Sequence, residues 1–134
     1  MALGATLART YLPEPIDRFR AFQLGAGIYL AFYVIGHMNS VFVYARHYLG
    51  IDTDWGFATG APDGLLHNAW NVRLIPHYTL AVFFVLAHLF AGLRIVLLAH
   101  NVPQRMADRT MIAGSIGGGL VALAIILGMC GVRI

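Results

Sequence analysis

The sequence predicts an all-α integral membrane protein in which three transmembrane helices form a bundle. Its composition, with 59% hydrophobic and 11% charged residues, lies outside the range of soluble domains. It also holds three mostly apolar stretches of at least about 20 residues, the length that a helix needs to cross roughly 30 Å of hydrocarbon. We therefore expect residues 1–134 to form a single membrane domain surrounded by lipid.

The three predicted transmembrane helices cover residues 22–44, 75–99 and 111–132. No acidic residue lies inside them, and their one arginine, Arg94, is close enough to the end of its helix to reach the lipid headgroups. The remaining chain is predicted to form an arm over residues 1–20 and a loop over residues 47–74. A short interfacial helix is expected at residues 65–72.

Basic residues near the spans predict the orientation in the membrane. The chain has nine arginines and no lysine. Most of them precede the first helix or lie around the connection between the second and third: Arg9, Arg18, Arg20, Arg94, Arg105 and Arg109. The N-terminus is thus expected in the cytoplasm, and the long loop and the C-terminus outside.

Two of the six histidines, His37 and His88, lie well inside predicted spans, where an ionisable side chain is costly unless it finds a partner in the protein interior. Counted from the outer helix ends, they lie at depths of roughly 15 and 18 Å. On two antiparallel helices they are expected at one level, where both imidazoles could ligate the iron of one haem. The alternative for each is a structural histidine with a hydrogen bond.

Other residues of the second helix fit the same interpretation. Gly92, one turn beyond His88, leaves room for a porphyrin edge, and His77 shares the face of His88 at a separation of about 16 Å. His77 is interpreted either as a second haem ligand or quinone contact, or as a polar residue at the membrane interface. The third helix carries Gly114, Gly118 and Ala122 at four-residue spacing, a pattern typical of close helix packing in lipid.

Two motifs resemble the membrane cytochrome b subunits of the succinate dehydrogenase and fumarate reductase family. The first runs from Phe22-Gln23-Leu24-Gly25-Ala26-Gly27 to Ile35-Gly36-His37-Met38, and the second is His88-Leu89-Phe90-Ala91-Gly92-Leu93-Arg94. Family members of this kind with a single three-helix anchor often work beside a second anchor or as an oligomer.

The resemblance implies that His37 and His88 are the axial ligands of a b-type haem, and that Arg94 pairs with a propionate or marks the cytoplasmic end of its helix. It also implies a nearby quinone and peripheral flavoprotein and iron–sulfur subunits. Weaker expectations are haem or quinone contacts at Arg20, Gln23, Ser40 and Tyr44.

The expected function is therefore that of a haem b anchor that transfers electrons between a peripheral redox partner and the quinone pool, in a bacterial cytoplasmic or mitochondrial inner membrane. The alternative is a structural transmembrane subunit without cofactor in a larger respiratory or photosynthetic complex. Expected partners are lipid and other membrane subunits or copies of the chain, and no nucleic acid. The sequence contains no phosphate-binding loop, zinc-type cluster or nucleophile–base pair.

Overall fold

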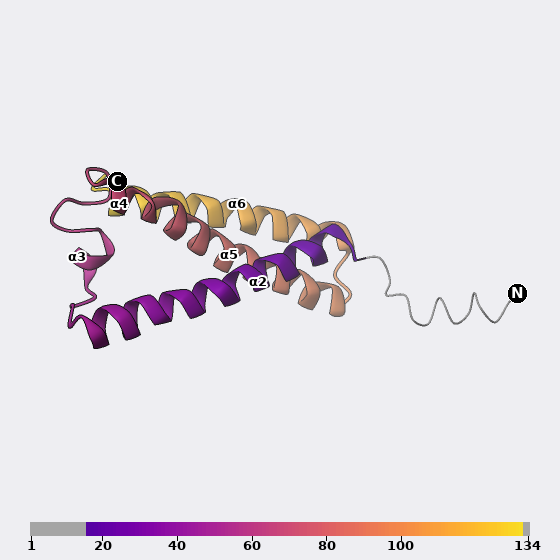
Figure 1. The fold of residues 1–134 in the computed structure, drawn as a ribbon. Coiled ribbons are helices and arrows are strands. Elements are labelled where there is room, and N and C mark those ends of the chain that lie inside the picture. The colour runs from indigo at the N-terminus through magenta and orange to yellow at the C-terminus, as the bar shows by residue number, and fades with distance from the viewer. Residues whose placement is uncertain (1–15, 133–134) are drawn as a thin grey trace, which may run out of the picture.

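The structure, a computed structural model, describes residues 16–132, and its regular elements in this range are all helical. They are α2 (Arg18–Met38), the π-helix η1 (Asn39–Tyr48), the short helices α3 (Trp55–Ala58) and α4 (Ala69–Val72), and the long helices α5 (Leu74–Ala99) and α6 (Gln104–Met129), shown in Figure 1. Three helical segments are long and apolar enough to cross a membrane: Arg18–Tyr48, Ala69–Ala99 and Gln104–Met129.

The first long helix extends beyond its predicted bounds at both ends. Asp17 caps its start, because its carboxylate accepts hydrogen bonds from the backbone N–H groups of Phe19 and Arg20. The helix therefore begins at Arg18 rather than Phe22, and the rest of the predicted arm, residues 1–15, lies outside the described residues. At its other end the backbone changes to a π-helix that runs to Tyr48.

Helix α5 agrees with its predicted bounds to within one residue, whereas α6 begins at Gln104 rather than Met111. The chain leaves α5 through Asn101, which has a φ of 60°, and Pro103 precedes the first residue of α6. Proline suits the start of a helix because its missing N–H has no partner there. Polar residues beyond Pro103 are compatible with a helix, so α6 extends past its apolar part.

The long loop folds over one end of the helices. Asn71 in α4 stabilises the loop, because its side-chain amide donates to the carbonyl oxygens of Gly60 and Gly64 at 3.1 Å each. The predicted interfacial helix shortens to α4, whose start is capped by the side chain of Asn68.

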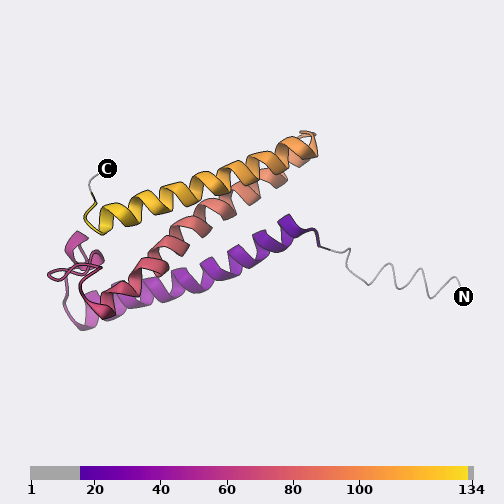
Figure 2. The same ribbon diagram turned by 90° about the horizontal axis from the view of Figure 1, so that it is seen from above.

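The three long helices form a more open arrangement than the expected bundle. Helix α5 packs against both α2 and α6 (Figure 2), while α2 and α6 have no close backbone contact and separate toward the loop end (Figure 1). The buried residues in the helices are mostly small, and large apolar side chains point outward: Phe32 is 76% exposed and Leu120 64% exposed. This distribution fits lipid as the solvent, because helices in lipid associate through small residues.

The seam between α5 and α6 depends on glycines. A Cβ added at Gly114 would overlap the ring of Phe90, and one added at Gly118 would lie 2.9 Å from Cβ of Leu86. The small-residue stripe of α6 therefore receives the large side chains of α5, which confirms the packing role expected for Gly114 and Gly118.

Candidate intramembrane histidine sites

His88 lies half-buried against α2. Its Nδ1 atom is 3.2 Å from the backbone carbonyl oxygen of Gln23. A carbonyl only accepts hydrogen bonds, so Nδ1 carries a proton, and in the neutral ring the free lone pair is on Nε2. Gly27 makes the approach possible, because a Cβ there would lie 3.1 Å from Cε1 of His88. A histidine whose second ring nitrogen donates to a carbonyl has the arrangement typical of metal ligands.

His37 belongs to a different group of rings. It stacks on Tyr33, one turn earlier in α2, with ring centroids 5.5 Å apart and planes within 11°. The same tyrosine ring lies 4.7 Å from the ring of His77 on α5. The structure thus brings His37 and His77 together around Tyr33.

The expectation that His37 and His88 lie at one level is wrong. The ring of His88 lies beside Gly27, which is ten residues from His37 and therefore about 15 Å away along the helix axis. The depth count took the loop-side ends of the two helices as level. Leu74, the first residue of α5, instead lines the same cavity as Val41, and η1 continues past Val41 to Tyr48. In this arrangement His37 and His88 do not meet at one iron, and the role of each as a haem ligand stays a prediction.

A cavity of about 520 Å³, here called the loop-side cavity, lies where α2 and η1 meet the start of α5 under the loop. His37 and Ser40 line it from one helix, and His77 from the other. Its full lining is Gly36, His37, Ser40, Val41, Phe57, Gly60, Ala61, Trp70, Asn71, Arg73, Leu74, His77 and Tyr78. At this cavity the guanidinium of Arg73 lies 4.1 Å from the ring centroid of Trp70.

The change from α- to π-helix occurs between His37 and Ser40, at the wall of the loop-side cavity. π-Helical turns are rare and frequently accompany functional sites. No residue pattern in the sequence indicated this change.

Two other predicted cofactor contacts lie elsewhere. A Cβ at Gly92 would lie 4.0 Å from Nε2 of Gln23, so the space beside this glycine borders a side chain of α2. Tyr44 is 60% exposed and does not line the loop-side cavity.

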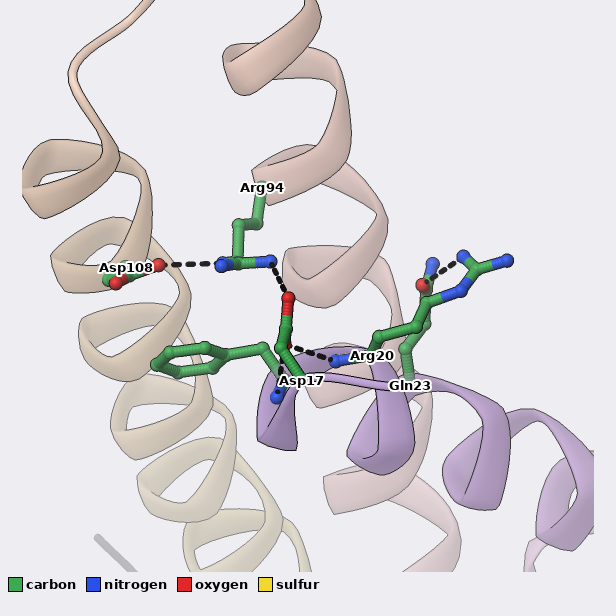
Figure 3. Close-up of polar contacts among 6 residues, drawn as sticks. Asp17, Arg20, Gln23, Arg94 and Asp108 are labelled. Carbon is green, nitrogen blue, oxygen red and sulfur yellow. Dashed lines mark hydrogen bonds and ion pairs between the residues drawn. The ribbon is translucent and has the colours of Figure 1, made fainter. Parts of the chain in front are cut away.

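Arg94 joins three segments at the opposite end of the helices (Figure 3). Its Nε donates to Oδ1 of Asp108 on α6 at 2.7 Å, and its terminal nitrogen lies 3.6 Å from Oδ2 of Asp17 at the start of α2. It is 5% exposed, and its guanidinium carbon lies 4.4 Å from the ring centroid of Phe19. Arg94 is thus bound to two carboxylates, rather than extended to the headgroups as the sequence suggested.

Asp17 and Asp108 were missed as functional neighbours of Arg94, because both lay outside the predicted spans. A signal was present, since acidic residues are favourable near helix starts. The pKa of Asp17 is lowered most by the backbone N–H of Arg20, and desolvation opposes this as the second-largest effect. The N–H of Phe19 and the charge of Arg94 lower the pKa further.

Two predicted quinone residues, Arg20 and Gln23, lie together near this end. The Arg20 guanidinium donates to Oε1 of Gln23 at 2.8 Å (Figure 3). Ser40, the third, lies instead at the loop-side cavity. Over residues 16–132, no three histidine, cysteine or acidic side chains form a group able to hold a metal ion by themselves.

Fold and site together define a class, that of α-helical proteins with several membrane-length helices and ionisable side chains between them. Comparison of the chain with protein-family models, curated proteins and solved structures gives no match.

Proposed function

We propose that the chain is a haem b-carrying membrane anchor subunit that transfers electrons between a peripheral redox partner and the quinone pool. The observation that supports this best is the presence of His37 and His77, from two neighbouring apolar helices, at one cavity. The proposal keeps the expected cofactor but replaces His88 by His77 as the partner of His37. The Tyr33 ring, which contacts both imidazoles, would turn aside to admit the haem.

The residues of the loop-side cavity suit a haem in their chemistry. Imidazole is a common axial ligand of haem iron, and a volume of about 520 Å³ lies within the range of roughly 300–1,000 Å³ usual for ligand pockets. Arg73 offers a cation for a propionate group. The haem would supply one-electron chemistry, while the chain supplies ligands and an apolar environment.

His88 lies at a second depth along the helices, and its ring is also arranged to bind a metal. Its hydrogen bond to Gln23 holds the ring and leaves Nε2 able to bind a metal. Among the described residues the rings of His37 and His77 lie at the other level, so a haem at His88 would take its second ligand from another subunit or copy of the chain.

For partners and orientation, the proposal keeps the sequence-based expectations. The arginines around the α2 start and the α5–α6 connection favour a cytoplasmic location for this end, in a bacterial cytoplasmic or mitochondrial inner membrane. A peripheral flavoprotein or iron–sulfur subunit would dock at that end. Arg20 and Gln23 are the proposed quinone contacts there, because their paired side chains offer hydrogen-bonding groups near the membrane surface.

A structural subunit without cofactor is the second candidate. The outward-facing large apolar side chains favour it, because they could equally cover a neighbouring transmembrane subunit. Under this alternative the rings of His37 and His77 do no more than pack around Tyr33.

A reduced-minus-oxidised absorption spectrum of the purified full chain tests the proposal. We expect a b-type signature that is lost in His37→Ala and His77→Ala and retained in His88→Ala. His100→Ala is the matched control, because this histidine is exposed at the end of α5 and, within residues 16–132, its ring bonds only to the carbonyl of Val96. Circular dichroism checks that each variant keeps its helices.

Two other outcomes would change the ligand assignment or the function. Loss of the signature in His37→Ala and His88→Ala but not in His77→Ala would restore the original pair and overturn the revised one. Absence of any haem signature in the unmodified chain, purified from cells supplied with a haem precursor, would support the structural subunit instead.

A further inference from the structure

An apolar groove of about 480 Å³ lies at the end of the helices opposite the loop-side cavity. It is bordered by the start of α2 on one side and by α6 on the other, with Phe83 of α5 between them. We call it the α2–α6 groove, and its lining is Arg18, Phe19, Phe22, Phe83, Met111, Ile112, Ser115, Ile116 and Gly119. It shares no residue with the loop-side cavity.

The groove exists because α2 and α6 pack on α5 from two sides without close backbone contact with each other, as Figure 2 shows. Small residues deepen it on the α6 side, where a Cβ at Gly119 would meet only the ring of Phe83, at 3.9 Å. Its lining is almost entirely hydrocarbon, and both bordering helices are membrane-length spans. An acyl chain suits such a groove better than water does, because its walls offer almost no hydrogen-bonding groups.

Arginines stand at the end of the groove nearest the membrane surface. Arg18 lines it directly. Arg109 is exposed and lies three residues before Ile112 and seven before Ile116, which places it on the same face of α6 one turn toward the helix start.

The carboxylates described at this end do not form ion pairs with those arginines. Asp17 and Asp108 both pair with Arg94, and over residues 16–132 neither Arg18 nor Arg109 forms an ion pair. An apolar groove with cations at its mouth matches a molecule with a hydrocarbon tail and an anionic head.

We propose that the α2–α6 groove binds an anionic phospholipid, with one acyl chain along Phe22, Phe83 and Ile116 and the phosphate held by Arg18 and Arg109. Guanidinium groups bind phosphate oxygens through paired hydrogen bonds. A zwitterionic lipid also has a phosphate, but its headgroup carries a cation that competes with the arginines for that phosphate. The site is independent of the haem proposal.

Native mass spectrometry of the full chain in mild detergent, titrated with dioleoyl phosphatidylglycerol or dioleoyl phosphatidylcholine, tests this site. We expect tighter binding of phosphatidylglycerol and a loss of about fivefold in its affinity for each of Arg18→Gln and Arg109→Gln. Arg46→Gln is the charge control, because this exposed arginine lies at the other end of the first span.

A second pair of variants tests the groove itself. Gly119→Leu should fill it and weaken binding of both lipids, whereas Gly117→Leu should not, because Gly117 has no neighbour within 4 Å and does not line the groove. Unchanged helicity by circular dichroism shows that each variant is folded.

Three results would overturn the proposal. One is equal binding of the two lipids with no effect of the arginine variants. Another is full retention of phosphatidylglycerol by folded Gly119→Leu. The last is a dimer that Gly119→Leu dissociates, since a second copy would then occupy the groove.

Discussion

Arg94 is an almost fully buried charged side chain on an apolar helix, and its neighbours explain why its burial is tolerated. Burying an unpaired charge is costly, but Arg94 has a close bond to Asp108 and a longer ion pair with the more exposed Asp17. Because the three residues come from α5, α6 and the start of α2, the cluster fixes one end of all three long helices.

Replacing Arg94 by methionine tests that role. We expect the free energy of unfolding to fall by about 3 kcal/mol, since Asp108 is left partly buried without its partner. Arg94→Lys should cost less, because an ammonium keeps the charge but cannot bond both carboxylates with the same geometry. Denaturant titration of helicity in micelles measures both, with exposed Arg105→Met as the control. Equal stability of Arg94→Met and Arg105→Met would contradict the role.

The histidines show how far residue-level prediction reached. The residue count along each span identified His37 and His88 as intramembrane groups. The structure places His88 against α2, and His37 at a cavity that α5 also lines. The expectation of a common level was wrong because depth was counted along each helix separately. The offset between two helices is set by the loop and by side-chain packing, and neither is visible in the spacing of residues along one helix.

Packing between the elements is most specific at the α5–α6 seam. Phe90 and Leu86 project from α5 onto Gly114 and Gly118 of α6, so a methyl group on either glycine would enter occupied space. Gly117 lies on the same helix with no neighbour within 4 Å. The two kinds of glycine should therefore respond oppositely to alanine.

For Gly114→Ala we expect destabilisation of about 1–3 kcal/mol, because Phe90 must move out of its place. For Gly117→Ala we expect a small gain of up to about 1 kcal/mol, because alanine favours the helix over glycine. Denaturant titration of helicity in micelles gives both values. Combining Gly114→Ala with Phe90→Ala should recover part of the loss in a double-mutant cycle, and simple additivity of the two effects would show that the contact is absent.

Element boundaries were predictable where the sequence carries a local signal. The bounds of α5 followed from its apolar stretch, and Pro76 lies in its first turn, where a missing N–H has no helical partner. The early start of α6 was missed because Arg105, Asp108 and Arg109 resemble loop composition, although nothing there breaks a helix. The π-helix after Met38 had no signal at all, since its backbone geometry depends on the packing of neighbouring side chains.

At the scale of the whole molecule, three spans place the two ends of the described chain on opposite sides of the membrane. The start of α2 lies beside the α5–α6 connection, and the end of α6 lies beside the loop, as Figure 1 shows. Arginine is concentrated at the first of these ends, so membrane insertion should keep that end in the cytoplasm.

Cys130 makes this orientation testable, because it is the single cysteine of the chain and lies just after α6 on the loop side. A membrane-impermeant maleimide should label it in intact bacterial cells that express the chain. In a Cys130→Ser background, Arg105→Cys at the opposite end should react only after the membrane is permeabilised, and Cys130→Ser alone should not react. The reverse pattern would place the arginine-rich end outside. The peripheral partner and the anionic lipid would then have to meet the chain from that side, because both proposed contacts depend on the arginines and move with them.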